Sequence, residues 1–123
     1  YVAHRGSPYV TILDTDTLAL VRRVYVGSEV TALKVDLQTD RILIARRNSD
    51  AIDLYDSQSF LPVDNIRVNA DVEFMAIDGE SNSVLLVLSQ QGQVQIVPLV
   101  SKRASATLDV GVKPYAVVVA GER

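Results

Sequence analysis

The sequence predicts an all-β protein, and three observations support this fold class. Most of its 123 residues fall into short runs of β-branched and other apolar residues, separated by small polar clusters, which is the pattern of strands and turns. The runs YVTILD (9–14), AIDLYD (51–56) and QVQIVP (93–98) alternate apolar with mostly polar residues, as half-buried strands do. Each of these runs begins 42 residues after the one before it. A repeated unit of strands therefore underlies the chain.

The period of 42 residues holds over the whole chain without a gap. Gly27 and Gly111 lie two periods apart, with Asn69 between them. Because Asn is the best substitute for Gly where φ is positive, these three residues predict a shared turn. The matching apolar positions are Val10, Ile52 and Val94; Ile12, Leu54 and Ile96; Val24, Ile66 and Leu108; Val26, Val68 and Val110; and Val35, Ile77 and Val119.

Each unit contains four predicted strands, which in the first unit cover about 1–4, 9–14, 20–26 and 31–36. Four strands in a period of 40 to 45 residues indicate a propeller blade. A sandwich or a simple meander also contains four-stranded units, but neither requires equal periods. We therefore expect a β-propeller fold with three four-stranded antiparallel blades, in one partial domain over 1–123. Its repeats cover about 1–42, 43–84 and 85–123.

The residues also resemble a known repeat family. The stretch YVAHRGSPYVTILDTDTLALVRRVYVG and the later DVGVKPYAVVVAG (109–121) are similar to the YVTN-type β-propeller repeat. The second unit departs most, with LIARRNSDAIDLYD, but stays in phase. This resemblance implies the strand order B, C, D and then A of the next blade. The chain would then start on a B strand and end on an A strand at 115–120.

Three blades do not close a ring, because propellers typically have four to eight. The unpaired edges that remain favour pairing with other chains. The chain starts at Tyr1 rather than Met, which favours a processed product or a part of a longer polypeptide. Two arrangements remain open. Other blades or a partner chain complete a larger propeller or assembly, or two copies close a six-bladed ring as a homodimer by exchanging terminal strands.

Composition excludes several classes of function. The chain has no cysteine, which excludes disulfides, thiolate catalysis and sulfur-ligated metals. Its formal net charge of -3 gives no reason to expect general attraction to nucleic acid or membranes. No run approaches the roughly 18 apolar residues of a membrane span. The family resemblance implies a periplasmic or extracellular, bacterial protein, although composition fits a cytoplasmic location equally well.

Two short stretches suggest chemistry, but structural interpretations fit them better. His4 is the only histidine, and no neighbouring residues show the spacing of metal ligands. We interpret it as a loop residue. The stretch DTDT (14–17) lacks the glycine and the glutamate of a calcium loop. Together with DSQS (56–59) it predicts turns in which Asp bonds the backbone. We therefore expect no catalytic residue, no metal and no cofactor.

One surface pattern suggests binding. In a propeller the B–C and D–A loops share one face, which here would collect basic residues among Glu29, Asp50 and Asp71. Arginine binds carboxylates and phosphates in bidentate fashion. This face could dock an acidic partner or a small anion, or it could carry ordinary solvated charge. Its candidate residues are His4, Arg5, Arg46, Arg47 and Lys113.

These observations favour a non-catalytic scaffold or protein-binding module that is part of a larger propeller or assembly. An alternative is the propeller portion of a periplasmic enzyme or redox subunit of the haem, quinone-linked or lyase type. A further alternative is a repeat module of a surface layer or fibre. The partner's identity lies beyond the sequence.

Overall fold

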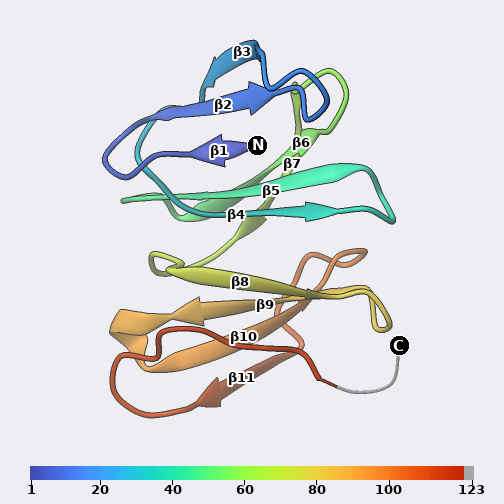
Figure 1. The fold of residues 1–123 in the computed structure, drawn as a ribbon. Coiled ribbons are helices and arrows are strands. Elements are labelled where there is room, and N and C mark those ends of the chain that lie inside the picture. The colour runs from blue at the N-terminus through green and yellow to red at the C-terminus, as the bar shows by residue number, and fades with distance from the viewer. Residues whose placement is uncertain (121–123) are drawn as a thin grey trace.

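A computed structural model describes residues 1–120, which form an all-β structure (Figure 1). The strands of this region are β1 (Val2–Ala3), β2 (Tyr9–Leu13), β3 (Leu20–Tyr25), β4 (Val30–Asp36), β5 (Arg41–Arg46), β6 (Ala51–Asp56), β7 (Pro62–Arg67), β8 (Phe74–Asp78), β9 (Ser83–Leu88), β10 (Gln93–Pro98) and β11 (Ala106–Asp109). One turn of 3-10 helix, η1 (Ser89–Gln91), joins β9 to β10. Within residues 1–120 no helix has the length and apolar character needed to cross a membrane.

The strands form three antiparallel sheets, each a meander in chain order. The first sheet contains β1, β2 and β3; the second contains β4 to β7; the third contains β8 to β11. The sheets lie one below another in Figure 1, with β4 and β8 next to each other. The all-β prediction is confirmed.

The sheets differ from three complete four-stranded blades in two places. The first sheet has three strands, as expected of a chain that starts on a B strand and lacks the A strand before it, because no strand pairs with β1 on the side away from β2. Residues 115–120 do not form the expected strand. Both differences share a cause, since a strand exists only where a neighbouring strand supplies hydrogen bonds. The end of the third repeat (85–123) and Gly121 of the family motif reach beyond the described residues.

The period of 42 residues recurs in the backbone. Leu18, Phe60 and Lys102 occupy the same position in each unit and have φ of 59, 54 and 59°. The prediction of positive φ is confirmed for Gly27 (φ 106°) and Gly111 (φ 102°) but is wrong for Asn69, whose φ is not positive. The loop from Arg67 to Phe74 is longer than the loop from Tyr25 to Val30. It therefore follows a different path.

Two apolar clusters fill the spaces between the sheets. One joins the first and second sheets around Val10, Ile42, Ile44, Tyr55 and Phe60. The other joins the second and third sheets and includes Leu43, Ala45, Leu54, Met75 and Leu86. Successive residues of β5 enter opposite clusters, because side chains alternate along a strand. This double burial explains why the run ILIA (42–45) is continuously apolar instead of alternating.

Candidate functional site

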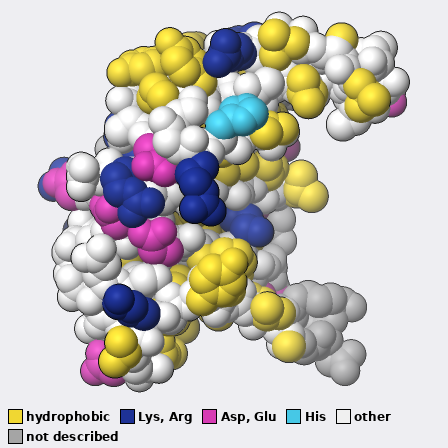
Figure 2. Space-filling view, turned by 60° about the vertical axis from the view of Figure 1, so that its left-hand side comes forward, with side chains coloured by type: hydrophobic (Ala, Val, Ile, Leu, Met, Phe, Trp, Pro, Cys, Tyr) yellow, Lys and Arg dark blue, Asp and Glu magenta, His cyan; other side chains and the backbone are white. Residues whose placement is uncertain are grey.

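The loops at one edge of the three sheets surround a cavity of about 770 Å³. These loops precede β2, β4, β6, β8 and β10, and with the segment after β11 they form what we call the loop face, on the left of Figure 1. Basic and acidic side chains lie intermixed beside the histidine on this face (Figure 2). Polar and aromatic residues that line the cavity are His4, Arg5, Glu29, Thr31, Arg47, Glu73, Phe74, Ser89, Gln90, Lys113 and Tyr115.

The lining repeats with the period of the sequence. Arg5, Arg47 and Ser89 hold one position of the three units, and all three line the cavity. A second position contributes Thr31, Glu73 and Tyr115, which also all line it. Each unit therefore presents the same two backbone positions to one shared cavity. Six of these lining residues were not predicted from the sequence: Thr31, Glu73, Phe74, Ser89, Gln90 and Tyr115. The 42-residue alignment with Arg5 and Arg47 could have identified Ser89.

Four of the five candidate docking residues line this cavity: His4, Arg5, Arg47 and Lys113. Arg46 does not. It lies at the end of β5, with its Nε 2.8 Å from Oδ2 of Asp53 on the neighbouring strand β6. This is an ion pair without the geometry of a hydrogen bond, because Nε donates to no acceptor. Arg46 therefore neutralises a carboxylate within its own sheet.

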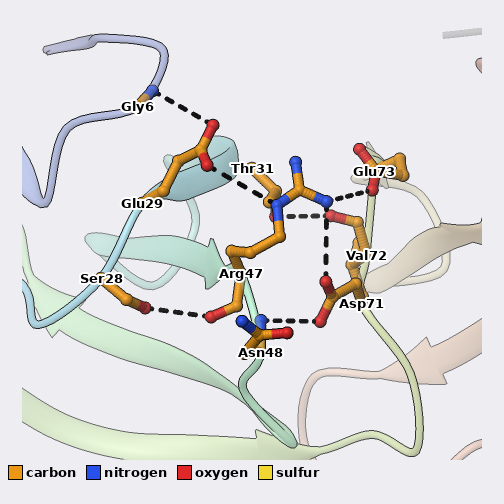
Figure 3. Close-up of polar contacts among 9 residues, drawn as sticks. All are labelled: Gly6, Ser28, Glu29, Thr31, Arg47, Asn48, Asp71, Val72 and Glu73. Carbon is orange, nitrogen blue, oxygen red and sulfur yellow. Dashed lines mark hydrogen bonds and ion pairs between the residues drawn. The ribbon is translucent and has the colours of Figure 1, made fainter.

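Arg47 joins three loops through carboxylates (Figure 3). Its Nη1 lies 2.8 Å from Glu73 Oε1 and 3.6 Å from Asp71 Oδ2, and its Nε lies 3.7 Å from Glu29 Oε1. The hydrogen bond to Glu73, together with the charges of all three acids, raises the pKa of Arg47 above its usual value. Glu29 also accepts a hydrogen bond from Gly6 N (3.1 Å), so this network connects the first, second and third sheets.

Backbone and hydroxyl groups extend the same network. Asn48 N donates to Asp71 Oδ1 (3.0 Å), and Thr31 Oγ1 donates to the carbonyl oxygen of Val72 (2.6 Å). Ser28 Oγ donates to the carbonyl oxygen of Arg47 (3.1 Å). The guanidinium of Arg47 is thus held in one place by several fixed groups, and its charge is matched by neighbouring acids. It is better suited to holding the loops together than to capturing an anion.

Arg5 and Lys113 differ from Arg47. Within residues 1–120 neither side chain forms an ion pair or a hydrogen bond. Lys113 occupies the unit position held by Glu29 and Asp71 in the earlier units, so a cation stands where the network elsewhere has acids. Its backbone has φ of 50°. The cavity therefore has two cations available for an acidic group.

His4 lies beside these cations without forming a metal site. Its Nε2 lies 3.3 Å from Thr11 Oγ1, and its side chain is exposed. Within residues 1–120, no group of three or more His, Asp or Glu side chains is placed to hold a metal ion. The interpretation of His4 as a loop residue agrees with this position.

The opposite edge of the sheets carries the predicted Asp turns. Asp14 Oδ1 accepts hydrogen bonds from Asp16 N (2.8 Å) and Thr17 N (3.1 Å), and Asp56 Oδ1 accepts them from Gln58 N and Ser59 N (both 2.9 Å). These backbone donors lower the pKa of both carboxyl groups. The turn prediction for DTDT and DSQS is confirmed.

Similarity to known proteins lies in the fold. No protein-family model and no curated protein matches the sequence. Among solved structures, hydrazine synthase from Kuenenia stuttgartiensis matches with a TM-score of 0.77 and 15% identity, over 89% of this chain and 32% of that one. Apo AztD from Citrobacter koseri matches with a TM-score of 0.73 and 11% identity, over 90% and 32%. The fold is therefore propeller-like, and the chain spans about a third of the length of these structures.

Proposed function

We propose that this chain is a non-catalytic propeller scaffold or protein-binding module, whose loop face docks an acidic group of a partner. One observation carries the proposal: Arg5 and Lys113 line the same cavity, and neither has an acidic partner within residues 1–120. A charge-assisted hydrogen bond to a carboxylate is stronger than a neutral one. Ser89, Gln90 and Tyr115 add neutral hydrogen-bonding groups to the same lining.

The proposal includes the architecture around the site. Each sheet is interpreted as a blade of a YVTN-type β-propeller, and the three blades form part of a ring that other blades or a partner chain complete. The first sheet lacks a strand at the edge of β1, and the chain spans about a third of its structural neighbours. Both facts support a partial ring. A periplasmic or extracellular location follows from the family resemblance.

A second candidate is the propeller portion of an enzyme or redox subunit. The likeness to hydrazine synthase favours this candidate, although the identity of 15% carries only the fold. A visible absorption spectrum and a metal analysis of the purified chain separate the two functions. A haem or flavin band, or stoichiometric metal, would support the enzyme candidate.

Binding of a fluorescent poly-glutamate peptide, followed by anisotropy at low and high salt, tests the docking proposal. The variant Arg5→Ala/Lys113→Ala should bind the peptide about tenfold more weakly or worse, because a hydrogen bond to a charged group contributes about 1.5–3 kcal/mol. The control Lys102→Ala/Arg103→Ala removes the same charge at the other edge of the sheets, and its affinity should change little. Equal loss in both variants would mean that the peptide senses only net charge.

A further inference from the structure

Resting on the proposed partial ring, we propose that two copies of this chain close one ring by exchanging residues 115–120. The segment of each copy would add as a strand to the free edge of β1 in the other copy. The inference specifies both the partner, a second copy, and the register of the new strand pair.

The register follows from two sheets of the same chain. In the second sheet Leu33 pairs with Ile44 and Ala32 with Ala45. In the third sheet the matching pairs are Met75 with Leu86 and Phe74 with Val87. Ile44 and Leu86 both correspond to Val2, one and two periods away, and Leu33 and Met75 both correspond to Val117. Each sheet independently gives the pairs Val117 with Val2 and Ala116 with Ala3.

Within residues 1–120 of one chain, neither the free edge of β1 nor residues 115–120 has a neighbouring strand to pair with. β1 pairs only with β2, and residues 115–120 form no strand. Tyr115 and Val118 are 89% and 83% exposed. β1 lies in the first sheet and this segment runs beside the third, with the second sheet between them (Figure 1). Pairing within one chain would require the stack to come apart.

The two end faces of the stack match its buried interfaces. On the first sheet the exposed Val2, Leu13 and Leu18 hold the positions of Ile44, Tyr55 and Phe60, which are buried between the first and second sheets. On the third sheet Leu108 is 50% exposed, while the matching Ile66 is buried against the third sheet. In the proposed dimer, the exposed face of the first sheet in one copy would pack against the exposed face of the third sheet in the other copy.

A second copy fits better than an unrelated chain because the exchange is reciprocal. A two-fold arrangement uses the same two surfaces twice and gives the free edge of β1 a partner strand in each copy. Two sets of three sheets give six, which lies within the range of four to eight blades. The dimer would have two seams, each an interface between the third sheet of one copy and the first sheet of the other. Each seam would resemble the interface between the second and third sheets within one chain.

Charge makes the new seams different from the internal one. In the alignment Arg5 takes the place of Arg47, and Lys113 of the second copy takes the place of Glu29. The internal ion pair between Arg47 and Glu29 is thus replaced by two cations. An acidic group bound at the seam would relieve their repulsion. This is the group that the proposed function places in the loop-face cavity.

A disulfide between designed cysteines tests the register, since the chain has no cysteine of its own. Directly paired antiparallel strands bring Cα atoms to about 4.5–5.5 Å, within reach of a disulfide, whereas pairs two residues out of register lie about 7–8 Å apart. After oxidation, Ala3→Cys/Ala116→Cys should run as a covalent dimer without free thiols. The control Ala3→Cys/Val118→Cys should remain largely unlinked. An intrachain disulfide, a ladder of larger species, or equal linking in both variants would overturn the proposal.

Light scattering of the unmodified chain provides the second measurement. The expected mass is twice 13.4 kDa, and a mass of one chain would overturn the proposal. Val117→Pro should give a monomer, because proline removes a ladder donor from the exchanged strand. Val112→Pro, at a 92% exposed position before that strand, should leave the dimer intact. A dimer that ignores the poly-glutamate peptide refutes only the docking function, and a monomer that binds it refutes only the exchange.

Discussion

The first and second sheets carry the same 42-residue pattern, but only the second is covered on both faces. Ile44 in β5 is fully buried, whereas Val2 at the matching position of β1 is 37% exposed. Phe60 is 2% exposed, and the matching Leu18 is 77% exposed although both have the same left-handed backbone. The apolar pattern thus marks which positions can be buried. Whether such a position is actually buried depends on whether another sheet packs against it.

This difference has an energetic consequence. The free energy gained by burying an apolar side chain is proportional to the area removed from water. In a stack of sheets that area is buried between neighbours, so the inner sheet gains from two interfaces and an end sheet gains from one. A further sheet packed on the apolar end face of the first or third sheet would therefore bury more apolar area and stabilise the fold.

The largest expected effect comes from truncating the matched pair Phe60 and Leu18. Phe60→Ala should lower the free energy of unfolding by about 3–5 kcal/mol, because it empties a filled site between the first and second sheets. Leu18→Ala should change it by no more than about 0.5 kcal/mol in an isolated chain, as surface substitutions do. Urea unfolding of both variants measures the difference. A cost for Leu18→Ala that grows with protein concentration would show that a second copy covers this residue.

A smaller effect should separate two glycines at one unit position. Gly27 and Gly111 have φ of 106 and 102°, so alanine is strained at either place, at a cost of about 1–3 kcal/mol. A Cβ on Gly27 would also lie 2.7 Å from Arg46 Nη1, whereas a Cβ on Gly111 would meet nothing within 4 Å. Gly27→Ala should therefore be the more damaging change, since Arg46 must move away from Asp53. Equal unfolding midpoints would mean that the side chain of Arg46 adjusts without loss.

The features that could be predicted from the sequence are those set by local pattern. The alternation in YVTILD and AIDLYD gave β2 and β6, and the Asp turns after them needed only an acceptor and nearby N–H groups. The positive φ of Gly27 and Gly111 likewise depends on the local turn. These elements depend on residues a few positions apart, so a single sequence contains the information.

The features that escaped prediction depend on distant partners. Arg46 and Arg47 are adjacent and looked equivalent, yet Arg46 pairs with Asp53 within its sheet and Arg47 pairs with three acids from two other loops. Residues 115–120 have a strand pattern but no neighbour to pair with. The free cations Arg5 and Lys113 could be recognised only after the carboxylates had been assigned to Arg47. These pairings depend on how distant parts of the chain pack together, which cannot be predicted from the 42-residue period alone.

The smallest effect should distinguish the matched turn residues Asp14 and Asp56 by NMR titration of their carboxyl groups. Both pKa values should lie below the ordinary 3.8, because backbone N–H groups donate to each carboxylate. Each turn therefore stabilises the fold fully above pH 3.8, and this contribution is lost as the pH falls through the lowered pKa of the folded state. Asp56 also lies 3.6 Å from Arg41, and salt screens an exposed ion pair more than a backbone hydrogen bond. Added 1 M NaCl should raise the pKa of Asp56 and leave that of Asp14 nearly unchanged. Equal salt-induced shifts of the two pKa values would show that the ion pair with Arg41 does not lower the pKa of Asp56.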